Sequence, residues 1–191
     1  MEHKKVLKFL EITGFIFMIV SALEVVFFIT LNFTPFDNII SGSVFLSEII
    51  YGSSYIHYLT TILWFFLIIT IAVYFVVGFF LRRTGKNSKI QRASLAKLMV
   101  LIGMIILMGG MIKLNYLVLL GKTRITTLLG PVSFQSAMYR FDISPLNAGI
   151  FWLYFIAANC SYLIAALVIT AVGIKWTILM GQERPKESKK D

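Results

Sequence analysis

Cysteine and histidine are nearly absent from this chain of 191 residues. The single cysteine, Cys160, excludes an internal disulfide, a Cys-x-x-Cys redox pair and a four-cysteine zinc site. The only histidines are His3, in the basic N-terminal segment, and His57, at the start of an apolar run. Two histidines so placed cannot both ligate one haem within a single helical bundle. We therefore expect no resident metal or cofactor.

Charge is also scarce. Asp, Glu, Lys and Arg make up 14% of the residues, against roughly 25% in soluble domains. Hydrophobic residues make up 58%, and the mean hydropathy is +0.84. This composition predicts a polytopic membrane protein whose main partner is the lipid bilayer. The net charge of +9 does not indicate nucleic-acid binding, because the basic residues flank apolar runs, as topology signals do.

Four apolar runs are each long enough to cross a bilayer, which takes about 20 residues. They cover about residues 9–32, 55–81, 95–120 and 148–174, with a basic connector at 82–94 and a basic tail at 175–191. The first run is too long for a signal-peptide core and lacks a small-x-small cleavage site, so we expect it to be retained. We predict a single all-α domain over residues 1–191, built as an antiparallel bundle of four transmembrane helices.

Lysine and arginine are distributed unevenly along the chain. Fourteen of the 18 lie in the terminal segments or between Arg82 and Lys97, whereas the two longer loops hold Lys122, Arg124 and Arg140. Short basic segments stay on the cytoplasmic side of a membrane. The sequence therefore predicts a protein of the cell membrane with both termini in the cytoplasm and both longer loops outside. We expect these loops to pack as a small cap, with a short interfacial helix at residues 44–51.

Lys113 lies deep inside the third apolar run, where an ammonium group costs about 2.5 to 3.5 kcal/mol at mid-membrane. Glu24 is its natural partner, because both runs cross in the same direction and both residues lie ~10–12 Å below the outer ends of their runs. A functional pair would handle a proton or an ion, or would orient a polar head group. The structural alternatives are a plain ion pair, or Lys113 reaching outward to the interface while Glu24 is protonated.

Three further polar side chains complete the predicted intramembrane polar cluster in the outer half of the bundle. They are His57 on the second run, Tyr116 on the third and Asn159 on the fourth. His57 lacks a neighbouring cysteine or second histidine, so the pattern favours an interfacial residue over a metal ligand. Asn159 is expected to hydrogen-bond across the bundle or to line a cavity.

Small residues at helix-packing spacing predict where the helices approach one another. They are Gly14 and Ser21 on the first run, Gly103 and Gly110 on the third, and Ala157, Ser161 and Ala165 on the fourth. The fourth run carries small and polar residues on its opposite side as well. We therefore expect it to pack against two neighbours.

The four-span layout is similar to that of claudins and tetraspanins, but the W-x-x-W-C-C and CCG signatures of those families are absent. The spacing of Gly103, Gly110 and Lys113 resembles the glycine–lysine span of DoxX/DoxD-type quinone-linked membrane subunits. It falls in the third span instead of the first, and we do not assign the chain to that family.

The sequence holds no phosphate-binding loop, no nucleophile with paired carboxylates and no cluster of metal ligands. The leading hypothesis is therefore a non-catalytic accessory or interaction subunit, with other membrane protein subunits as partners. The alternative is a small carrier or a lipid- or quinone-binding protein, associated with an oxidoreductase, that uses the polar cluster.

Overall fold

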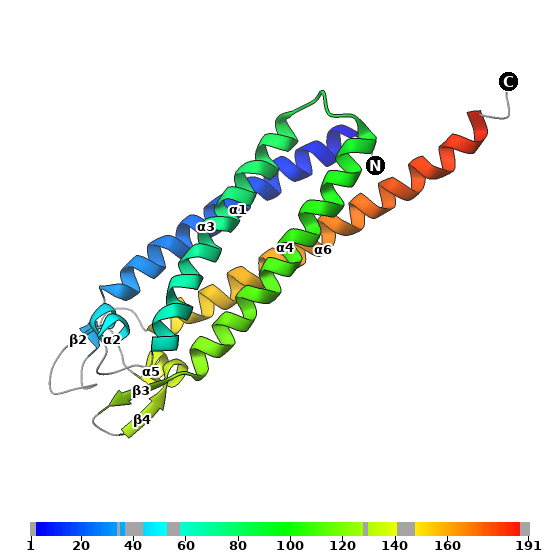
Figure 1. The fold of residues 1–191 in the computed structure, drawn as a ribbon. Coiled ribbons are helices and arrows are strands. Elements are labelled where there is room, and N and C mark those ends of the chain that lie inside the picture. Colours follow the sequence, from blue (N-terminus) through cyan, green and yellow to red (C-terminus); the bar gives the residue numbers. More distant parts are fainter. Residues whose placement is uncertain are drawn as a thin grey trace. The chain divides into compact units, whose positions relative to one another are not determined.

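A computed structural model describes residues 3–33, 35–36, 44–52, 58–127, 130–140 and 148–187 of the chain. Four long helices make up most of this part (Figure 1): α1 (His3–Asn32), α3 (Tyr58–Lys86), α4 (Arg92–Lys122) and α6 (Ala148–Glu187). All four are long and apolar enough to cross a membrane, α6 over Ala148–Met180. The prediction of four such helices is confirmed for the described residues.

The helices extend further than the apolar runs that predict them. α1 begins at His3, α3 continues through two arginines to Lys86, and α4 begins at Arg92. Of the basic connector predicted at 82–94, only residues 87–91 are non-helical. Lysine and arginine are good helix formers, and near a helix C-terminus they interact favourably with the helix dipole. Hydropathy marks only the apolar part of each helix, and the helical conformation continues beyond that part. Residues 55–57, where the second span was expected to begin, lie outside the described residues.

The connection between α1 and α3 contains two short strands and one short helix. β1 (Pro35–Phe36) pairs antiparallel with β2 (Val44–Phe45), and α2 (Leu46–Tyr51) follows directly. The Phe45 backbone N–H donates to Glu48 Oε2 at 3.1 Å, which satisfies a donor at the start of α2. The helix expected at residues 44–51 thus forms from residue 46, after a two-residue strand.

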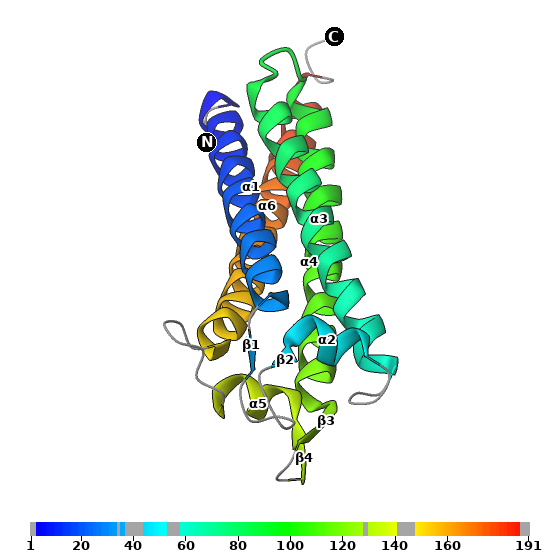
Figure 2. The same cartoon turned by 90° about the vertical axis from the view of Figure 1, so that its left-hand side faces the viewer.

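The connection between α4 and α6 contains a β-hairpin and a second short helix (Figure 2). β3 (Arg124–Thr127) and β4 (Gly130–Ser133) pair antiparallel, and α5 (Phe134–Arg140) follows. Gly130 has a φ of +105°, a conformation that glycine adopts without steric cost. The Phe134 N–H donates to the carbonyl of Thr123 at 2.7 Å, which ties the start of α5 to the end of α4.

The chain divides into two compact units, and each takes a segment from all four long helices. The first unit comprises Met1–Met18, Val76–Met111 and Cys160–Asp191, and the second comprises Ile19–Phe75 and Ile112–Asn159. The described members of the predicted polar cluster all belong to the second unit: Glu24, Lys113, Tyr116 and Asn159.

Glycines bring helix backbones close together in the first unit. A Cβ at Gly14 of α1 would overlap the backbone of α3 at Gly78, and a Cβ at Gly78 would lie 2.8 Å from Phe17 Cβ. α4 and α6 approach each other in the same way at Gly103 and Gly173. Membrane helices pack by such close approach because lipid supplies no hydrophobic driving force between them.

An aromatic core holds the second unit together. The Trp64 ring of α3 stacks on Phe28 of α1 at 4.6 Å between centroids and contacts Phe134 of α5 at 5.9 Å. Phe134 in turn contacts Trp152 of α6 at 5.8 Å. The short helix α2 buries its apolar residues in the same core: Leu46, Ile49 and Ile50. Within this unit the two connections therefore bury their short helices together with residues of all four long helices.

Candidate functional site

Two opposite charges meet in the interior of the second unit. Lys113 Nζ of α4 donates a hydrogen bond to Glu24 Oε1 of α1 and forms an ion pair with it. Both side chains have an exposed fraction of 0%. The Tyr74 ring of α3 faces the same ammonium group, with 5.4 Å between Nζ and the ring centroid, close enough for a cation–π attraction. The structure therefore brings together the two charges that the sequence pairs by depth.

Chemically, this arrangement satisfies each charge with a group of the same chain. An unpaired charge in a low-dielectric interior is costly, and a partner with a hydrogen bond compensates much of that cost. Neither side chain has exposed surface that a dissolved substrate could reach. The geometry suits a pair that fixes how α1 and α4 pack, in the way that interhelical polar contacts do within lipid.

Further buried polar side chains lie on α1 and α6 within the second unit. Ser21, about one turn before Glu24 on α1, is fully buried. The Tyr154 hydroxyl of α6 donates to the backbone carbonyl of Val20 at 3.3 Å, which links α6 to α1. Asn159, further along α6, is also fully buried. The contact of Tyr154 with Val20 places α6 against α1 in this unit.

Of the other two members of the predicted cluster, the structure describes only Tyr116. Tyr116 is half-buried and packs on Phe66 of α3, with 5.4 Å between ring centroids. Phe66 is itself exposed, so Tyr116 lies toward the surface of the unit. His57 lies outside the described residues. Spacing along one helix predicts which face of that helix a residue occupies. Which residue of a neighbouring helix it contacts depends on how the helices pack.

The predicted small residues divide between the interior and the surface. Gly14, Ser21, Gly103 and Gly110 are buried, whereas Ala157 and Ser161 are exposed and Ala165 is half-buried. On α6 the buried line is shifted by one residue and consists of Ala158, Tyr162, Ala166 and Ile169. Since the sequence shows small residues on both sides of α6, it could not decide which side faces inward.

A hydrogen bond at the outer end of the predicted first span was missed. The Asn32 amide Nδ2 donates to the Phe28 carbonyl at 2.8 Å, and Asn32 Oδ1 accepts from Trp64 Nε1 at 3.3 Å. Asn32 and Trp64 are both buried. A polar amide at the end of an apolar run was a usable signal, because a buried amide and a buried indole both need a partner.

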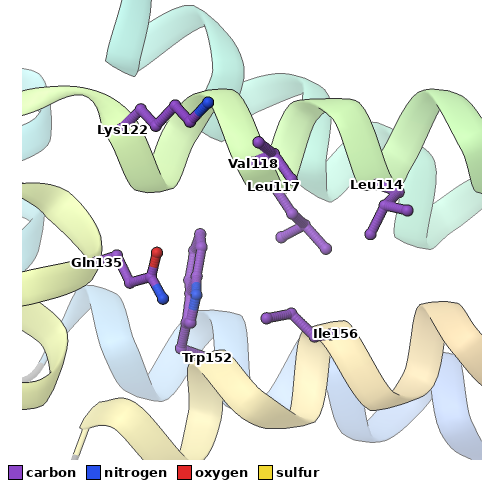
Figure 3. Close-up of a pocket in the computed structure, with 7 residues that line it drawn as sticks. All are labelled: Leu114, Leu117, Val118, Lys122, Gln135, Trp152 and Ile156. Atoms are coloured by element: carbon purple, nitrogen blue, oxygen red, sulfur yellow. The ribbon is translucent and has the colours of Figure 1, made fainter.

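A cavity of about 280 Å³ lies in the second unit among residues of α4, α5 and α6 (Figure 3). Its walls are formed by Leu114, Leu117, Val118, Lys122, Gln135, Trp152 and Ile156. None of these residues belongs to the predicted polar cluster. This cavity was not predicted from the sequence, because its walls come from three segments that only the folded chain brings together.

In the part of the chain that the structure describes, no group of three or more His, Cys, Asp or Glu side chains is placed to hold a metal ion. The four long apolar helices are compatible with a multi-pass membrane protein. Comparisons with protein-family models, with curated proteins and with solved structures find no match.

Proposed function

We propose that the protein is a non-catalytic accessory or interaction subunit of a membrane complex. Its four spans form an antiparallel bundle in the cell membrane, with both termini in the cytoplasm and the two longer loops outside. The distribution of lysine and arginine supports this orientation, because the terminal segments and the connector hold most of the basic residues. The Glu24–Lys113 pair is structural in this proposal and fixes the packing of α1 against α4.

The observation that carries the proposal is a difference between two exposed helix faces. On α3 most exposed residues of the apolar part are bulky and apolar, as at Phe65 and Ile69, which suits contact with lipid, and Ala72 is the one exposed small residue among them. On α6 three exposed small residues come within two turns: Ala157, Cys160 and Ser161. Small residues let a second helix approach closely within lipid, whereas bulky ones fill the space between a helix and the acyl chains. A helix of a partner protein fits this face of α6.

In-membrane photocrosslinking tests the proposal. A photoreactive amino acid is introduced at Ser161 on α6, with Ile69 on α3 as the matched control because it is 54% exposed. We expect a protein adduct from the α6 position and lipid adducts alone from the α3 position. Lipid adducts alone from both positions would refute the proposal. An adduct of twice the chain mass of 21.7 kDa would show self-association and would contradict an accessory role.

The alternative, a carrier or a lipid- or quinone-binding protein that uses the polar cluster, requires a ligand to reach Glu24 and Lys113. Both side chains are fully buried and bound to each other, which argues against it. A ligand-dependent change in the reactivity of Glu24 toward a hydrophobic carbodiimide would favour the alternative. If Glu24 is equally protected from the carbodiimide with and without quinone, the result supports the structural role.

A further inference from the structure

The cavity of the second unit is polar at one end and apolar at the other. Figure 3 shows Lys122 and Gln135 at one end, beside the indole of Trp152, and Leu114 and Ile156 at the other. The residues from α4 repeat at helical spacing, so they share one face of that helix. At 1.5 Å per residue, the eight residues from Leu114 to Lys122 span about 12 Å. A ligand that matches this cavity has a polar group and an apolar chain.

Packing holds the indole of Trp152 in place beside the polar end. Trp152 is buried and contacts Phe134, the residue before Gln135. The backbone of α4 comes close at Gly121, where a Cβ would lie 3.2 Å from Trp152 Cζ2 and 3.4 Å from Gln135 Oε1. The hydrogen bond from Phe134 N–H to the end of α4 fixes the start of α5. The indole is thus positioned before any ligand arrives, which lowers the entropic cost of binding, whereas the side chains of Gln135 and Lys122 are exposed.

Lys122 ends α4, and its side chain is exposed. In a helix that spans a bilayer, the terminal residues lie at the level of the lipid headgroups. In such a bilayer the Lys122 ammonium group would lie at the level of the lipid phosphates and Leu114 at the depth of the acyl chains. A volume of about 280 Å³ is below the ~300–1,000 Å³ of sites that enclose a drug-sized ligand. It suits one part of a larger molecule whose remainder stays in the membrane.

We propose that this cavity binds an anionic phospholipid. The ammonium group of Lys122 and the amide N–H groups of Gln135 bind the phosphate oxygens, and one acyl chain lies along Leu114, Leu117 and Ile156. Charge complementarity at one end and an apolar wall at the other select an anionic lipid over a neutral one and over a free anion. The inference does not rest on the partner proposed above, because its test uses the purified chain alone.

Native mass spectrometry of the full chain in detergent tests the proposal. Phosphatidylglycerol and phosphatidylcholine with identical acyl chains are titrated separately, and bound lipid is counted. We expect phosphatidylglycerol to bind about five-fold more tightly, which is the ~1 kcal/mol that a basic residue contributes near an anionic surface. Lys122→Gln should remove this preference. Arg124→Gln is the matched control, since Arg124 is an exposed basic residue two positions away that does not line the cavity, and it should retain the preference.

Two further arms separate the sources of binding. Leu114→Trp fills the apolar end of the cavity. We therefore expect it to weaken the binding of both lipids by a similar factor, while the protein keeps its helical circular dichroism spectrum. If that variant does not fold, Ile156→Phe replaces it. Inorganic phosphate at the lipid concentration should neither bind nor displace lipid. Equal binding of the two lipids to the unaltered protein, an equal loss in the Arg124→Gln control, or displacement by inorganic phosphate would each overturn the proposal.

Discussion

The Glu24–Lys113 pair predicts a large energetic coupling between two residues that are far apart in the sequence. Replacing Glu24 with Gln leaves an ammonium group buried without a countercharge, and replacing Lys113 with Met leaves a buried carboxyl group. Removing one partner of a buried pair costs about 3–5 kcal/mol. We expect the Lys113→Met loss to be the smaller, because a carboxyl group left alone can be neutralised by taking up a proton. The double variant should recover much of either loss, since two neutral side chains of similar volume remain.

The magnitude follows from burial. Both side chains are fully buried, so neither salt nor solvent screens their attraction. The chain supplies a matched control in the first unit, where Lys86 Nζ lies 4.0 Å from Glu11 Oε1 and the side chains are 56% and 39% exposed. Exposed ion pairs contribute about 0–1 kcal/mol. We therefore expect a coupling above about 1.5 kcal/mol for the buried pair and well below that for the exposed pair.

The assay is a double-mutant cycle on reversible unfolding in mixed micelles, followed by tryptophan fluorescence and circular dichroism. Each pair needs both single variants, the double variant and the unaltered protein, all in one detergent mixture. The readout is the difference between the double variant and the sum of the singles. A buried-pair coupling no larger than that of Lys86 and Glu11 would refute the reasoning. It would mean that Lys113 reaches solvent or that Glu24 is already neutral.

Three further outcomes are expected. Gly78→Ala should lower the free energy of unfolding by about 1–3 kcal/mol, because the added Cβ has no room against α1; thermal unfolding measures the loss, and an unchanged midpoint would contradict the close approach. Asn32→Leu removes the acceptor of the Trp64 indole N–H and should cost about 1–3 kcal/mol, part of which Trp64→Phe should restore in the same background. In a cysteine-free background, a cysteine at Ser136 should react with an impermeant thiol reagent in intact cells and one at Ser88 should not. The reverse pattern would overturn the proposed orientation.

The number and type of the long helices followed from the sequence alone. A run of apolar residues longer than about 20 cannot be dissolved in water as an exposed helix and can cross a bilayer, so composition and length predict such elements. The contact between Glu24 and Lys113 could also be predicted from the sequence. A charge within an apolar run needs a partner, and few candidates at a matching depth exist in a chain with nine acidic residues.

The ends of the helices and their inward faces could be predicted from the sequence only in part. Hydropathy follows the apolar side chains, whereas the backbone hydrogen bonds of α3 continue to Lys86 through residues that hydropathy excludes. The inward face of α6 was ambiguous, because a side with Ala158 and Ala166 and a side with Ala157 and Ser161 both suit close packing. Such a choice depends on the surface of the neighbouring helix, and one sequence window does not contain that surface.

The cavity and its charged end were decided by tertiary structure alone. Lys122 and Leu114 are linked by helical spacing, but Gln135 and Trp152 reach them only because the β3–β4 hairpin and α5 return the chain to α4. Gly121 permits this approach by lacking a Cβ. Periodicity determines what one helix presents along its length. A volume enclosed by three segments depends on how their backbones meet, and that is a property of the packed chain.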